Sequence, residues 1–202
     1  MTIAEQPTSP ADPSDPAALM LLPQLANRRG FDNILGSYHP GRKPAAIALS
    51  LELDAVLVAG GQVLSREDLG RRNLSLQAGW DEAAGNLIAL AINREGAIAA
   101  SLIHSGHGQW WKLSIGETCA GSWLAHPHTF SIVNDFLRTR LGGEPYYRLP
   151  APGERSMLVT ADAPTVADTN ERDVVIYQAG FPVPLDRARP VEHTGVGFLL
   201  AS

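Results

Sequence analysis

A chain of 202 residues is long enough to bury a sizeable hydrophobic core, and this length favours one domain over two. Its formal net charge of -5 excludes a general attraction to nucleic acid or anionic lipid, because both need clustered Lys and Arg. Its apolar runs, such as residues 87–92, fall far short of the roughly 20 residues that span a bilayer. The sequence therefore predicts neither a nucleic-acid partner nor a membrane partner.

The cysteine content indicates a reducing compartment. Cys119 is the single cysteine, so the chain forms no internal disulfide, whereas secreted proteins of this size more often carry paired cysteines. The first 15 residues contain no Lys or Arg and no apolar run, so they lack the basic and hydrophobic parts of a secretory signal. We expect a soluble, cytoplasmic protein.

Proline recurs through residues 1–16, among Ser, Thr, Asp and Ala. Such a composition buries too little apolar surface to offset the entropy lost on ordering, so we predict a disordered tail there. The remainder, residues 17–202, is predicted to be one domain. Asp15 and Pro16 resemble a helix N-cap and first turn, so a short helix is expected over residues 17–22, with Pro23 interrupting or kinking it.

The first strongly apolar segment runs from Ala45 to Val58 and predicts one long bent strand or two short ones. A brief strand is expected at residues 62–64. Ser65 is followed three residues later by Asp68, which resembles a capping box. We therefore expect a short helix to begin after Ser65.

Two longer helices have clear periodic patterns. Pro127 to Leu141 is predicted to be helical, because its apolar positions share one face and Gly142 supplies a left-handed stop. Gly79 and Gly85 lie inside the other helix, where each costs about 1 kcal/mol relative to Ala, and this predicts close packing against a neighbour. The apolar stripe of that helix, spaced by three and four, consists of Leu76, Trp80, Ala83, Ala84, Leu87, Ile88 and Ala91.

Two β-hairpins are predicted around these helices. Residues 97–104 and 109–115 alternate apolar and polar on either side of a four-residue loop. Residues 146–149 and 156–161 form the second pair. Further strands are expected near residues 174–178 and 196–201. This order of helix, hairpin, helix and hairpin predicts an α+β fold, with helices packed on one face of a mainly antiparallel sheet.

A series of short segments recurs in a characteristic order over roughly residues 55–161, about half of the chain. The segments are Ala55-Val56-Leu57-Val58, residues 62–69, the helix with Ala84, Asn86 and Leu87, and residues 122–124, 136–137, 149–150 and 158–160. In this order, and mostly in their apolar pattern, they resemble the YtpQ-like family of uncharacterised bacterial proteins. The resemblance implies the fold class and carries no assigned site, because the family offers none.

Four histidines, His104, His107, His126 and His128, fall within 25 residues of one another. Imidazole serves both proton transfer and metal ligation at neutral pH, and a zinc site needs three or four such ligands, with Cys119 as a further candidate. Neither spacing includes the Glu or second Cys of a familiar zinc motif, so ordinary loop and helix-start positions are the other interpretation. For Cys119, a buried inert thiol is the alternative to a nucleophile or a ligand.

Trp110 and Trp111 are adjacent in a predicted strand, so their side chains should point to opposite faces. Trp111 belongs to the more apolar row with Leu113 and Ile115, and we expect this row to face the helices. Trp110 then lies on the outer face with Lys112, a mixed aromatic and polar surface that is typical of interfaces. Either the N-terminal segment or a partner is expected to cover it.

No phosphate loop, dinucleotide-binding fingerprint, nucleophile elbow or His-Glu-x-x-His motif occurs in the sequence. The leading hypothesis is a non-catalytic binding or protein-interaction module, in which Trp110 and Lys112 meet another protein or a second copy of the chain. The alternative is a small metal-dependent enzyme that uses the four histidines to hold zinc.

Overall fold

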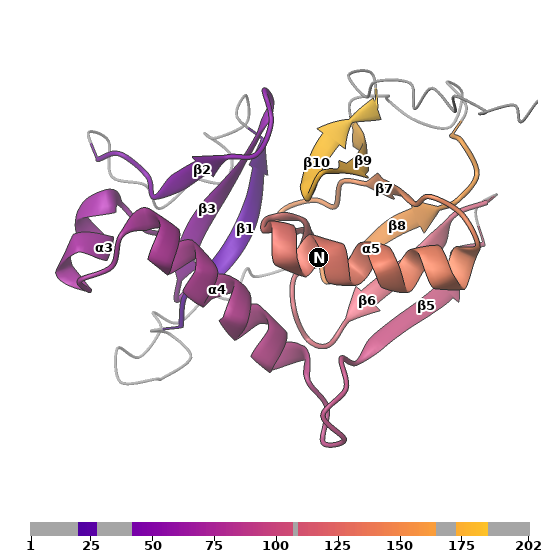
Figure 1. Ribbon diagram of the computed structural model, residues 1–202, viewed down its shortest axis with the longest axis horizontal. Helices are drawn as coiled ribbons and strands as arrows, with labels where there is room; N and C mark the ends of the chain where they lie inside the picture. The colour runs from indigo at the N-terminus through magenta and orange to yellow at the C-terminus, as the bar shows by residue number, and fades with distance from the viewer. Residues whose placement is uncertain (1–19, 28–41, 107–108, 165–172, 186–202) are drawn as a thin grey trace, which may run out of the picture.

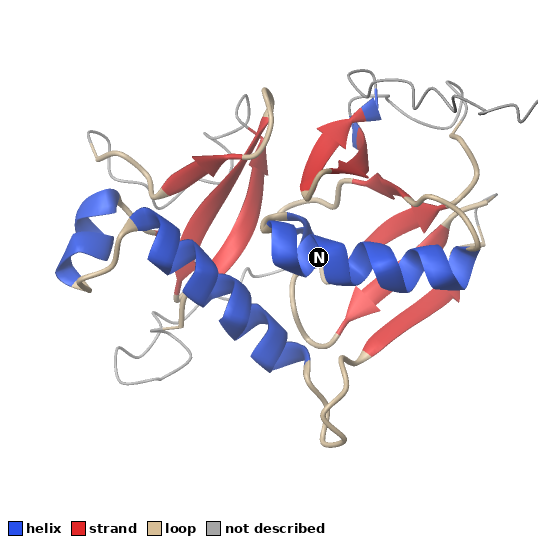
Figure 2. Cartoon of the chain, viewed as in Figure 1, coloured by secondary structure: helices blue, strands red, loops and turns tan. Residues whose placement is uncertain are grey.

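The computed structural model describes residues 20–27, 42–106, 109–164 and 173–185. In this part of the chain the strands form two sheets, and all strand pairings are antiparallel (Figure 1). The two long helices accompany them, one beside each sheet (Figure 2). The chain is therefore a mixed α and β protein, as predicted.

The four-stranded sheet is built around β3, which is buried along nearly its whole length and pairs with each of the other three strands. The apolar segment from Ala45 to Val58 contributes both β2 and β3, so it forms two short strands rather than one bent strand. The four strands are β1 (Leu22–Asn27), β2 (Ala46–Ala48), β3 (Leu53–Ala59) and β4 (Gln62–Val63).

The helix predicted over residues 17–22 is wrong where the structure describes it, because Leu22 begins strand β1. Pro23 lies opposite Leu57, and β1 is an edge strand, where a residue without an N–H costs no ladder hydrogen bond. The predicted disordered tail at residues 1–16 and the strand expected near residues 196–201 lie outside the described residues.

The other three predicted helices are present. Helix α3 (Arg66–Arg71) opens with the capping box: the Ser65 hydroxyl accepts from the Asp68 N–H at 3.2 Å, and the Asp68 carboxylate accepts from the Ser65 N–H at 2.8 Å. Helix α4 (Leu76–Ala91) buries the predicted stripe around Trp80. Helix α5 (Pro127–Leu141) ends at Gly142 in the left-handed conformation, as expected.

The second sheet has six strands in the order β10-β9-β7-β8-β6-β5. Both predicted hairpins are confirmed, because β5 pairs with β6 and β7 pairs with β8. A 3₁₀ helix, η2 (Ala120–Leu124), joins β6 to α5. The strands are β5 (Ala100–His104), β6 (Trp111–Ile115), β7 (Tyr146–Arg148), β8 (Ser156–Thr160), β9 (Val174–Gln178) and β10 (Phe181–Pro184).

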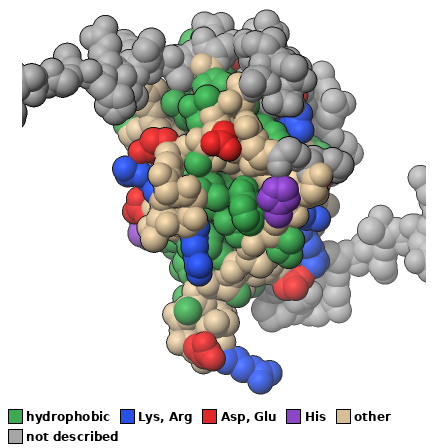
Figure 3. All heavy atoms as spheres, turned by 90° about the vertical axis from the view of Figure 1, so that its right-hand side faces the viewer, with side chains coloured by type: hydrophobic (Ala, Val, Ile, Leu, Met, Phe, Trp, Pro, Cys, Tyr) green, Lys and Arg blue, Asp and Glu red, His purple; other side chains and the backbone are tan. Residues whose placement is uncertain are grey.

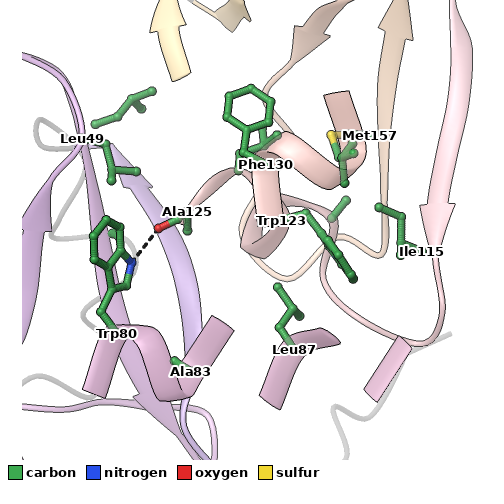
Figure 4. Packing of buried hydrophobic residues seen from close by; sticks show 14 of the residues in the cluster. Leu49, Trp80, Ala83, Leu87, Ile115, Trp123, Ala125, Phe130 and Met157 are labelled. Carbon is green, nitrogen blue, oxygen red and sulfur yellow. Dashed lines mark hydrogen bonds between the residues drawn. The ribbon is translucent and has the colours of Figure 1, made fainter. Parts of the chain in front are cut away.

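One hydrophobic cluster joins the two sheets, and it includes Leu57 from the first sheet and Val159 from the second. Between them, the buried Trp80 of α4 donates its indole N–H to the carbonyl oxygen of Ala125, just before α5, at 2.8 Å (Figure 4). The predicted arrangement, with helices on one face of a single sheet, is therefore not the one adopted. The prediction has one mainly antiparallel sheet, whereas the structure divides the strands before α4 and those after it between two sheets.

Among the described residues, no helix combines the length and the apolar character that a membrane-spanning segment requires.

The two glycines inside α4 have different surroundings. A Cβ on Gly79 would lie 3.2 Å from Leu57 Cδ1 and 3.3 Å from Leu69 Cδ2, so close packing explains this glycine as predicted. A Cβ on Gly85 would meet no atom within 4 Å. Close packing therefore does not explain Gly85, and this part of the prediction is wrong.

We expect Gly85→Ala to raise the free energy of unfolding by about 1 kcal/mol, because Ala loses less backbone entropy in a helix and meets no neighbour here. Gly79→Ala is the matched control, and it should gain less because its new methyl group crowds Leu57. Denaturant melts of both variants measure the difference. An equal gain for both would show that packing does not distinguish the two positions.

Candidate functional site

The two adjacent tryptophans divide between the faces of the six-stranded sheet. Trp111 pairs with Val159 of β8, and its row continues through the buried Leu113 and Ile115 into the core. Trp110, one residue earlier, lies on the outer face but is only 5% exposed. The guanidinium carbon of Arg148 in β7 lies 5.7 Å from the centre of its ring.

Trp110 is therefore covered and forms no exposed patch in the described structure. Arg148 reaches this ring from β7, which is separated from β6 by β8 in the same sheet. Local alternation in the sequence indicates which face a residue occupies, but it does not show what covers that face.

Lys112, the other predicted binding residue, is exposed on the outer face. It lines a hollow of about 340 Å³ together with Arg148 and Leu158. Figure 3 turns the right-hand side of Figure 1 toward the reader and shows hydrophobic side chains beside a histidine, with basic side chains nearby. Lys112 therefore stays a candidate binding residue in β6, where it pairs with Ile103 of β5.

Strand β5 ends the six-stranded sheet and pairs with β6 alone among the described strands. Just outside the strand, the Ser105 N–H donates to the Trp110 carbonyl at 3.0 Å, and the Gly116 N–H donates to the Ala99 carbonyl at 2.6 Å. In an antiparallel pair, residues that hydrogen-bond to the neighbouring strand alternate with residues whose backbone groups point away. The backbone N–H and C=O groups of the odd-numbered residues of β5 thus point toward β6. Those of the even-numbered residues point away from β6, in the plane of the sheet.

The residues of β5 whose backbone groups point away from β6 are Ala100, Leu102 and His104. Their backbone N–H and C=O groups have no hydrogen-bond partner in the part of the chain that the structure describes. The strand contains neither proline nor a charged residue, and Ile103 on its outer face is 63% exposed. No described segment pairs with this edge, which therefore offers hydrogen-bonding groups to another strand.

The other sheet edges carry the features that normally prevent strand addition. Strand β10 contains Pro182 and Pro184, and β1 contains Pro23. Strands β2 and β4 have only three and two residues. Proline and short length are devices that protect natural edges. Among the described strands, β5 is the edge that has neither.

The predicted histidines do not converge in the described structure. His104 stands at the end of β5, where its Nδ1 accepts the Gly106 N–H at 3.2 Å and its ring meets Trp111 edge-on at 5.1 Å. His126 and His128 lie at the start of α5, and His107 falls outside the described residues. The described part of the chain contains no group of three His, Cys, Asp or Glu side chains able to hold a metal. The zinc site stays a prediction, which metal analysis of the purified protein tests.

His126 serves as the N-cap of α5. Its Nδ1 accepts the His128 N–H at 3.1 Å, and its Nε2 lies 3.2 Å from a carboxylate oxygen of Asp81 in α4. The ring also meets Trp80 edge-on, with the ring centres 4.4 Å apart. Both ring nitrogens are therefore engaged within the fold, which leaves neither free as a ligand or a general base.

Burial lowers the pKa of His126 below its ordinary value, and His128 acts in the same direction. The hydrogen bond and charge of Asp81 oppose this shift without overcoming it. The geometry agrees, because a protonated Nδ1 loses the hydrogen bond that caps the helix. The folded state therefore favours the neutral ring.

Cys119 precedes η2 and is partly exposed. Its sulfur lies 3.7 Å from the Gly153 carbonyl, the one hydrogen-bond contact of this thiol in the described structure. No histidine contacts the thiol there. The arrangement gives no support to Cys119 as a catalytic nucleophile.

We expect Trp110→Ala to lower the free energy of unfolding by about 3–5 kcal/mol, as for other buried aromatic residues. Trp111→Ala should cost less, because Trp111 is only partly buried. This ranking reverses the order that the sequence predicts. Urea melts of the two variants decide it, and a milder effect of Trp110→Ala would mean that Arg148 does not hold the ring in place.

The lowered pKa of His126 makes stability depend on pH. Its contribution is fully present above the unfolded-state value of 6.5 and is lost as the pH falls through the lower folded-state pKa. His126→Asn keeps a good N-cap but does not titrate, so its stability should fall less steeply below pH 6.5. Chemical melts at several pH values measure both slopes, and His128→Asn serves as the control. Parallel curves for wild type and His126→Asn would contradict the prediction.

No protein-family model matches the chain, and no curated protein or solved structure is significantly similar to it.

Proposed function

We propose that the chain is a non-catalytic interaction module that accepts an extended strand at the free edge of β5. The observation that carries this proposal is the set of outward backbone groups on Ala100, Leu102 and His104. Strand addition satisfies such groups with main-chain hydrogen bonds, and side chains on alternate positions then provide selectivity. The exposed Ile103 offers an apolar contact on the outer face.

The occupant proposed for this edge is β5 of a second copy. If two copies pair antiparallel about a two-fold axis, Leu102 faces Leu102 of the second copy, and Ala100 faces its His104. Each of these three residues then forms backbone hydrogen bonds with the residue opposite it, because the backbone groups of all three point away from β6. The strand has no charged residue, so pairing with itself brings no like charges together.

The outer face supports the same arrangement. Ser101 and Ile103 alternate with the hydrogen-bonded residues, so each Ile103 would lie opposite Ser101 of the second copy. Lys112 pairs with Ile103 inside the chain, which places it one strand away from the new contact. Lys112 therefore flanks the proposed interface, whereas the covered Trp110 has no direct part in it.

His104→Pro tests the proposal with little cost to the fold. The N–H that proline removes points away from β6, so the internal pairing should survive, while the ring blocks the edge. His104→Ala is the matched control, because it removes the imidazole and keeps the N–H. We expect wild type and His104→Ala to be dimers and His104→Pro to be a monomer, as measured by light scattering after size-exclusion chromatography.

Circular dichroism of each variant verifies that the fold is retained. A folded His104→Pro dimer would show that self-association uses another surface. A wild-type monomer at every concentration measured would exclude the second copy as the occupant.

A further inference from the structure

A cleft of about 410 Å³ opens where the two sheets meet. Strand β1 of the first sheet contributes Gln24 and Leu25, and η2 contributes Gly121 and Ser122. A Cβ on Gly121 would lie 3.4 Å from Pro150 Cγ and 3.8 Å from Leu25 Cβ, so this glycine lets the walls come close together. The volume is within the usual range of small-molecule sites.

The walls of this cleft are mainly apolar. Leu25 and Leu53 come from the first sheet, and Leu149, Pro150 and Pro152 come from the segment between β7 and β8. Such a lining binds an apolar body by removing its surface from water, and a few polar groups then fix its orientation.

Ser122 provides one such polar group. It is 5% exposed, and its hydroxyl makes no hydrogen bond to the described residues. In the described structure, every side-chain oxygen or nitrogen that is fully buried has a hydrogen-bond partner. Because the Ser122 hydroxyl has none, its oxygen must still be accessible to solvent. The cleft is the space that Ser122 lines. A nearly buried hydroxyl thus remains available to a ligand.

The described lining of the cleft carries a negative charge and no positive one. Asp173 is the one charged residue among the described residues that line it, and no Lys, Arg or His is among them. Asp173 has no ion-pair partner in the described structure. Asp173 is exposed at the rim of the cleft, where its carboxylate attracts a cation and repels an anion through a solvent-screened interaction.

We propose that this cleft binds a small molecule with an apolar body and a protonated amine. The apolar body packs against Leu25, Leu53 and Leu149. The ammonium group faces Asp173, and the Ser122 hydroxyl accepts or donates a further hydrogen bond. This site is separate from the edge of β5, so it neither requires strand addition nor contributes to it.

Cys119 makes the site measurable, because it lines the cleft and is the single cysteine of the sequence. An occupant of the cleft should shield its thiol from iodoacetamide, and intact-mass spectrometry reports the rate of alkylation. Three probes of one shape test the chemistry: 2-phenylethylamine, 2-phenylethanol and phenylacetate. Methylamine adds a cation without an apolar body.

We expect 2-phenylethylamine to slow alkylation in a saturable way, 2-phenylethanol to act at higher concentration, and phenylacetate and methylamine to have no effect. Asp173→Asn should weaken protection by the amine roughly two- to fivefold, since it removes one solvent-exposed charge pair. Asp135→Asn, which changes the net charge equally at a residue of α5 that does not line the cleft, should leave the protection unchanged.

Equal protection by all three aromatic probes would overturn the role of Asp173, and so would an equal effect of Asp135→Asn. No protection by any probe, in a chain whose Cys119 reacts freely, would overturn the site itself. The solution mass measured in the same samples separates this result from the proposed dimer, because the mass depends on β5 alone.

Discussion

The hydrogen bond from Trp80 to Ala125 holds the two sheets in one arrangement. Trp80 belongs to α4, which continues from the four-stranded sheet, and Ala125 begins the turn into α5 on the six-stranded sheet. The indole is buried, so leaving its N–H without a partner would cost about 1–3 kcal/mol. His126 packs against the same ring and caps α5. One buried side chain thus connects the helix that follows the four-stranded sheet to the segment that starts α5.

The local elements of this fold can be predicted from the sequence, because they depend on spacing within a short segment. Leu76 to Ala91 and Pro127 to Leu141 have helical periodicity, and the structure ends both helices where the pattern ends. The hairpin around residues 105–110 follows from alternation. The segment before Pro23 is the exception, because the sequence predicts a helix there that Pro23 interrupts. Proline also tolerates an edge strand, and the pairing with β3 decides which of the two forms.

The candidate sites depend on contacts between distant segments, so the sequence predicts them poorly. Trp110 is on the outer face as expected, but Arg148, 38 positions later, covers it. The open edge of β5 becomes visible only once the strand order is known, although the lack of charge and proline in its sequence is a signal. The cleft needs Gln24 of strand β1 and Ser122 of η2 to line the same space. No periodicity within either segment contains that information.

The two prolines of β10 make the two edges of the six-stranded sheet different, because β5 at the other edge has none. Proline can pair in a strand only where its nitrogen faces away from the neighbour, so the buried Pro182 and Pro184 leave no N–H on the side of β10 that faces away from β9. Among the described strands of this sheet, the β10 edge is thus protected and the β5 edge is not. Growth of a fibre needs two different surfaces that join head to tail. In the proposed dimer, the β5 edges of both molecules pair with each other, so this contact would give a finite assembly and not a fibre.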